Sequence, residues 1–60
     1  MTMPTINALE LAAAGGASDA SHAVFHPDGS LYFCVKANLD EEREVAFWEA
    51  RGMTVKRVTQ

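Results

Sequence analysis

The sequence has little of what small secreted or membrane proteins depend on. It holds one cysteine, Cys34, so no disulfide can form within the chain, whereas small secreted domains normally carry several. No lysine or arginine precedes Lys36, so the first residues lack the positive region of a signal peptide. The longest apolar run there, residues 11–14, is far too short to cross a bilayer. We therefore expect a protein of a reducing, cytoplasmic compartment.

Basic charge is also scarce. Five Lys and Arg residues stand against eight Asp and Glu, which gives a formal net charge of −3. This balance argues against a general binder of polyanions, because such proteins carry clustered positive charge. The chain is 60 residues long and 48% hydrophobic, as a folded domain would be. We expect one small domain, residues 1–60, that has no room for the deep cleft of a large enzyme.

The first third of the chain predicts a short helix followed by a flexible linker, together residues 1–21. The helix would span 5–14, with Thr5 as its cap, and one face would carry Ile6, Leu9 and Ala13. Two glycines end it, and small polar residues continue to Ser21. A helix this short folds only when it docks on something else. The compact part of the domain is expected over residues 22–60.

Two strands, 23–25 and 31–35, are expected to form a hairpin around the turn Pro27-Asp28-Gly29. Strict alternation would then sort the side chains onto two faces. The expected core face carries Ala23, Phe25, Leu31, Phe33 and Val35. The opposite face carries His22, Val24, His26, Tyr32, Cys34 and Lys36.

A main helix over 38–51 and a third strand over 53–59 complete the expected fold. Asn38 and Glu41 have the spacing of a capping box, and Gly52 is placed to end the helix. The helical connection should make the third strand parallel to the second, beside either the first or the second. The sequence thus predicts an α+β fold: a single-layer ββαβ sheet packed on one main helix, with a short N-terminal helix.

The main helix carries two apolar sides, although covering one sheet requires a single stripe. One side holds Leu39, Ala46, Phe47 and Ala50, and the other holds Val45 and Trp48, flanked by Glu41 and Glu44. One side should pack on the hairpin, and the N-terminal helix or another chain should cover the other. We interpret Trp48 and Val45 as the anchor for a partner and the two glutamates as setting specificity. The structural alternative is that Trp48 belongs to the core.

These features favour a small non-enzymatic protein–protein interaction module that self-associates, most simply as a homodimer. The acidic helix also fits an accessory or inhibitor protein of the phage or plasmid type, in which carboxylates imitate a phosphate backbone. The alternative function is nucleic-acid binding by the non-core sheet face and the basic last strand. Its residues would be Tyr32, Lys36, Lys56 and Arg57.

Catalytic and metal-binding chemistry has weak support. His22 and His26 would lie roughly 13 Å apart along one strand, too far to share an ion. Cys34 and His22 have the types of a nucleophile and its base, but no orienting acid or oxyanion donors accompany them. The sequence therefore predicts no catalytic site, no metal and no cofactor.

Overall fold

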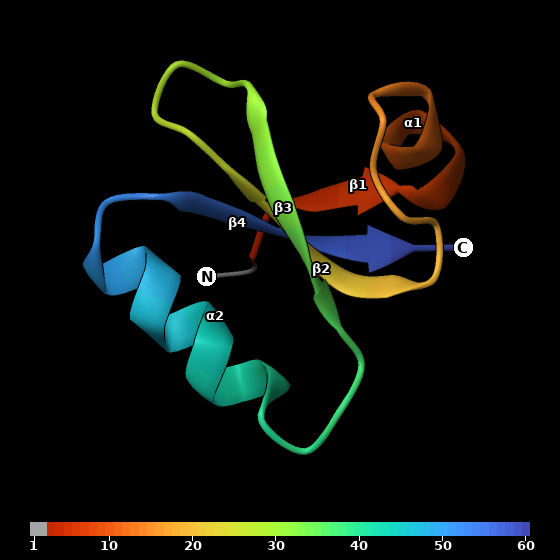
Figure 1. Cartoon of the computed structure of the whole chain (residues 1–60). Helices are drawn as coiled ribbons and strands as arrows, with labels where there is room; N and C mark the ends of the chain where they lie inside the picture. The colour runs from red at the N-terminus through yellow and green to blue at the C-terminus, as the bar shows by residue number, and fades with distance from the viewer. Residues whose placement is uncertain (1–2) are drawn as a thin grey trace.

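The computed structural model describes residues 3–60 as a four-stranded sheet with one helix on each face (Figure 1). No helix in this part of the chain is long and apolar enough to span a membrane. The elements in chain order are β1 (Thr5–Asn7), α1 (Ala8–Ala13), β2 (Ala20–Phe25), β3 (Leu31–Lys36), α2 (Glu41–Ala50) and β4 (Thr54–Thr59).

The sheet has the order β1-β4-β2-β3, and it confirms the predicted α+β class. β2 pairs antiparallel with β3 on one side and with β4 on the other, so β3 and β4 run parallel with β2 between them. The sequence left the place of this last strand open, and it lies beside the first strand of the hairpin. β1 was not predicted, and it adds a fourth strand by pairing parallel with β4.

The hairpin turn forms as expected, but the two strands do not keep one register. Gly29 has a φ of 95°, and the backbone N–H of His26 donates to the carbonyl of Ser30 over 2.8 Å. Phe25 pairs with Leu31, whereas Val24 pairs with Phe33, so Tyr32 is an extra residue in β3. An extra residue moves every later side chain of its strand to the other face.

The prediction that all five residues share one core face is therefore wrong. Phe33 and Val35 lie on the opposite side of the sheet from Ala23, Phe25 and Leu31. Two buried clusters lie on opposite sides of the sheet. The α1-side cluster contains Leu11, Ala20, Ala23 and Phe25, with Ile6, Leu31, Cys34 and Val58 packed against it. The α2-side cluster contains Val24, Val35, Val45 and Val55, with Met3, Phe33, Trp48 and Met53 packed against it. Each face of the sheet therefore carries a buried cluster and one helix.

The N-terminal helix forms, but it starts later than predicted. Asn7 caps it, since its side-chain oxygen accepts a hydrogen bond from the backbone N–H of Leu9 over 2.8 Å. Thr5 lies in β1 instead. Leu11 of this helix is fully buried, whereas Leu9, predicted on the docking face, is 82% exposed.

The segment expected to be a linker is fixed to the rest of the fold. The N–H of Gly16 donates to the carbonyl of Leu11 over 2.9 Å, and the N–H of Ala17 donates to Sγ of Cys34 over 3.4 Å. Ala20 and Ser21 already belong to β2. A division of the chain after residue 21 therefore cuts through a strand.

α2 begins at Glu41 without the predicted capping box. Asn38 accepts a hydrogen bond from the backbone N–H of Asp40 over 2.8 Å, which forms a turn before the helix instead of a cap. Three glutamates occupy the first turn, where the helix dipole favours negative charge. Gly52, with a φ of 84°, follows the end of the helix as expected.

Candidate functional site

Five aromatic rings gather where the C-terminal half of α2 meets the start of β3. Every contacting pair is edge-to-face, the geometry that aromatic quadrupoles prefer. The centroid distances are 4.9 Å for His26–Tyr32, 5.3 Å for Tyr32–Phe33 and for Tyr32–Trp48, 5.1 Å for Phe33–Trp48 and 5.0 Å for Phe47–Trp48. With Arg51, whose guanidinium carbon lies 4.3 Å from the centre of the Phe47 ring, these residues form what we call the aromatic patch.

The aromatic patch joins the core to the surface. Phe33 and Trp48 are half-buried and pack on the α2-side cluster, which holds their rings in place. Tyr32 contacts both of these rings and Phe47 contacts Trp48. Tyr32 and Phe47 are 49% and 48% exposed. Rigid aromatic side chains that are half in water lose little entropy on binding, because their neighbours already hold them in place.

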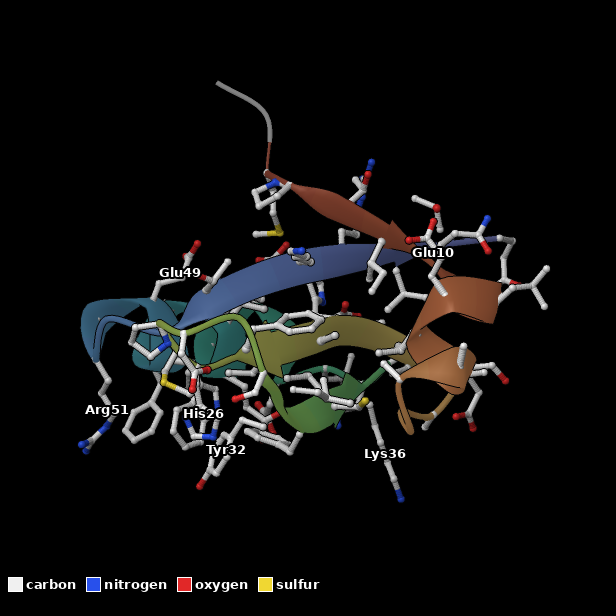
Figure 2. The ribbon with its side chains drawn as sticks, turned by 90° about the horizontal axis from the view of Figure 1, so that it is seen from above. Glu10, His26, Tyr32, Lys36, Glu49 and Arg51 are labelled. Atoms are coloured by element: carbon white, nitrogen blue, oxygen red, sulfur yellow. The ribbon has the colours of Figure 1, made fainter. Side chains whose placement is uncertain are left out.

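The patch lies along the free edge of the sheet. Within residues 3–60, β3 has a strand neighbour only on its β2 side. Figure 2 shows the strands from β1 at the top to β3 at the bottom, and the labelled side chains of Arg51, His26, Tyr32 and Lys36 all lie at the β3 edge. Glu49 of α2 points to the opposite side. Unpaired backbone groups, exposed rings and positive side chains thus share one surface.

The structure reverses the assignment of the two apolar sides of α2. Val45, predicted as a partner anchor, is 7% exposed and belongs to the core. Trp48 is half-buried and supports the aromatic patch from within. The helix docks with its Val45 side because that side faces the valines of β2, β3 and β4.

The other apolar side of α2 stays in solvent. Phe47 is 48% exposed, and Ala46 and Ala50 are exposed as well, whereas Leu39, predicted on the same side, lies in the turn before α2 and is 103% exposed. α1 does not cover them, because it packs on the opposite face of the sheet. The large apolar side chain of α2 that faces solvent is therefore Phe47 and not Val45.

The two glutamates predicted to set specificity have different surroundings. Glu41 Oε2 lies 3.6 Å from Nδ1 of His22 on β2, so it faces the sheet instead of a partner. Glu44 is half-buried on the side of α2 that also carries Arg51. Two helical turns separate Glu44 from Arg51, and this spacing returns a helix to nearly the same side.

The residues predicted for nucleic-acid binding do not converge. Tyr32 and Lys36 lie at the β3 edge (Figure 2). The ammonium of Lys56 lies 4.8 Å from the ring centre of Phe25, in the α1-side cluster. Arg57, the next residue of β4, points to the opposite face by strand alternation and lies beside β1, with which it pairs at Thr5. The four residues therefore share no single surface.

The polar groups around His22 do not make a catalytic triad. Ser21 Oγ lies 2.9 Å from His22 Nδ1 and also donates to the carbonyl of Val35 over 3.2 Å. Since Glu41 approaches the same ring nitrogen, serine and acid compete for one atom instead of flanking the ring as a relay requires. Residues 3–60 contain no cluster of three or more His, Cys, Asp or Glu side chains suited to hold a metal ion.

Comparison with protein-family models, with curated proteins and with solved structures finds no match to this chain.

Proposed function

We propose that the chain is a non-enzymatic protein–protein interaction module whose binding surface is the aromatic patch together with the free edge of β3. One observation carries this proposal: Tyr32 and Phe47 stand half-exposed on Phe33 and Trp48, directly beside the outer edge of β3, which has no strand neighbour within residues 3–60. Exposed apolar surface of this kind marks interaction sites in soluble proteins. The proposal includes a reducing, cytoplasmic compartment, which a single cysteine favours.

The composition of the surface favours a protein partner. Tyr, Trp and Arg are the residues most enriched among the energetic centres of protein interfaces, and the patch contains all three. A nucleic-acid surface would need several phosphate contacts, and the predicted basic residues are divided among the β3 edge and both faces of the sheet. The net charge of −3 opposes polyanions further.

The surface also offers two forms of contact at once. Strand edges bind extended backbone by hydrogen bonding, and neighbouring side-chain pockets or rings give such pairing its specificity. β3 supplies the first form and the aromatic patch supplies the second. A partner that pairs with β3 on the α2 side would therefore cover Tyr32 and Phe47 in the same step.

A site-specific photocrosslinking experiment tests this assignment. A benzophenone analogue of phenylalanine replaces Phe47 in one variant and Leu39 in the matched control, and both are irradiated in the producing cells. We expect a discrete protein adduct from position 47 and none from position 39, although Leu39 is the more exposed of the two. Equal adducts at both positions, or none at position 47, would show that the patch is not the binding surface.

A further inference from the structure

We infer that Asp28 and Gly29 of the hairpin turn form a modification site, at which isoaspartate arises when the hydrogen bonds of the turn open. Asp28 is the one Asp or Asn of the chain that a glycine follows. Because glycine has no Cβ, its backbone nitrogen can approach the preceding side-chain carboxyl, an approach that other residues hinder. This inference concerns the turn between β2 and β3 and does not depend on the proposed function.

The reaction is a cyclisation that needs no reactant besides water. The nitrogen of Gly29 attacks Cγ of Asp28, a C–N bond forms, and the N–H proton leaves with the carboxyl hydroxyl as water. The product is a five-membered succinimide ring. Water then opens the ring: cleavage of the new C–N bond restores aspartate, and cleavage of the original peptide bond gives isoaspartate, in which the main chain runs through Cγ.

In the folded chain both reacting groups are held by hydrogen bonds. The N–H of Gly29 donates to the carbonyl of His26 over 2.9 Å. Asp28 Oδ1 accepts from the backbone N–H of Ser30 over 2.9 Å and from its hydroxyl over 2.6 Å. These bonds from Ser30 lower the pKa of Asp28 and keep its carboxyl charged. A charged carboxylate resists attack by the nitrogen, so the turn suppresses the reaction.

Burial adds no protection to this site. Residues 27–30 are all exposed, and a Cβ at Gly29 would meet no atom within 4 Å apart from its chain neighbours. Exposed turns open locally without unfolding the rest of a domain. The rate of isoaspartate formation in the folded chain should therefore depend on the hydrogen bonds that Ser30 makes.

The modification would reach the aromatic patch. Isoaspartate adds one carbon atom to the main chain of a turn that is closed by the N–H of His26, which donates to the carbonyl of Ser30 over 2.8 Å. The rings of His26 and Tyr32 stand on the two sides of this turn, 4.9 Å apart. A longer turn should separate them, and their NMR resonances should shift in the modified chain.

Incubation of the chain at mildly acidic pH, followed by peptide mapping, tests the inference. Isoaspartate at residue 28 should form about tenfold faster, or more, in urea than in the folded chain, because unfolding releases the turn. Ser30→Ala removes the hydroxyl donor and should raise the rate in the folded chain about fivefold, the factor that a typical hydrogen bond gives. Ser30→Thr keeps the hydroxyl and should restore the wild-type rate.

Two controls separate the turn from general loosening of the fold. Phe47→Ala weakens the packing of α2 on Trp48 without touching the turn, so it should react at the wild-type rate. Asp19 and Asp40 are followed by alanine and glutamate and should stay unmodified in every digest. Circular dichroism at the incubation temperature shows that each variant is folded.

Three results would overturn the inference. The first is a folded wild-type chain that reacts as fast as the chain in urea. The second is a Ser30→Ala variant that reacts no faster than wild type. The third is equal acceleration by Phe47→Ala and Ser30→Ala, because the reaction would then proceed through unfolding of the domain and not through opening of the turn.

Discussion

The two faces of the sheet are covered by unequal helices, and the smaller helix carries the more deeply buried side chain. α1 has six residues and buries Leu11 completely. α2 has ten residues, yet Val45 is its one buried side chain, and Phe47 remains 48% exposed. The difference lies in the path of the chain beyond each helix. The chain after α1 folds back, and Gly16 packs on Leu11, whereas the chain after α2 turns directly into β4.

We expect the two faces of the sheet to have different roles, one in stability and the other in binding. The α1 side, which we call sealed because the chain folds back over Leu11, should contribute mainly to stability. The α2 side carries its apolar surface out to the free edge, where it is available for binding. We therefore expect variants on the α1 side to change the free energy of unfolding and variants at the aromatic patch to change association instead.

The largest expected effect comes from Leu11→Ala. Removing a fully buried leucine costs the transfer energy of its methyl groups and leaves a cavity, together about 3 kcal/mol. A domain of this size has a stability of roughly 3–9 kcal/mol, so the variant should be close to unfolding. Urea denaturation followed by circular dichroism measures the loss.

Phe47→Ala is the matched control on the other side of the sheet. It removes a larger side chain, but one that is half in water, so we expect a loss of only about 1 kcal/mol, mainly from its contact with Trp48. Both variants are compared at low protein concentration, where association does not contribute. Similar losses from the two substitutions would contradict the division between a sealed and an open side.

Gly16→Ala should produce an intermediate effect. A Cβ at Gly16 would lie 2.5 Å from Cδ1 of Leu11 and 3.1 Å from Sγ of Cys34, so the buried leucine would have to move. Overfilling a packed site of this kind costs about 1–3 kcal/mol. The same denaturation experiment measures it.

A double variant shows whether Leu11 is the cause. In the presence of Leu11→Ala, the added methyl group at position 16 meets a cavity instead of a side chain. The combined loss should therefore be smaller than the sum of the two single losses. Additive losses would mean that Gly16 acts through its backbone instead of through contact with Leu11.

Local signals in the sequence were enough to predict the hairpin turn, α2, β4 and the α+β class. The turn residues and the helix-ending Gly52 act over a few positions, so they can be interpreted without the rest of the fold. Face assignment failed because one extra residue, Tyr32, reverses the alternation of the rest of β3. No local signal marks that position, and the extra residue becomes apparent only when Phe33 and Val35 are seen to pack on the α2 side.

The site was predicted in part. Periodicity showed that α2 has two apolar sides, and Tyr32 and Trp48 were both named. Which side docks depends on the sheet it meets, and this is a non-local property. β1 was missed for a similar reason: its three residues gain their strand conformation from pairing with β4, more than 50 positions away.

The smallest expected effect lies in the hairpin turn, outside both clusters. The hydroxyl of Ser30 donates to Asp28 over 2.6 Å and its backbone N–H donates over 2.9 Å, and these bonds lower the pKa of Asp28 below its ordinary value of 3.8. A carboxyl whose pKa is lower in the folded state stabilises the fold fully above its unfolded pKa. That stabilisation is lost as the pH falls through the lower folded value.

NMR titration of the Asp28 carboxyl should therefore show a midpoint below 3.8 in the folded protein. Ser30→Ala removes the hydroxyl donor but keeps the backbone N–H, so the midpoint should rise toward the ordinary value without reaching it. Because Asp28 is exposed and contacts neither helix, the resonances of Leu11 and Trp48 should not follow this titration. A shared midpoint would show that the turn is coupled to one face of the sheet, and the face that responds would identify which side depends on the hairpin register.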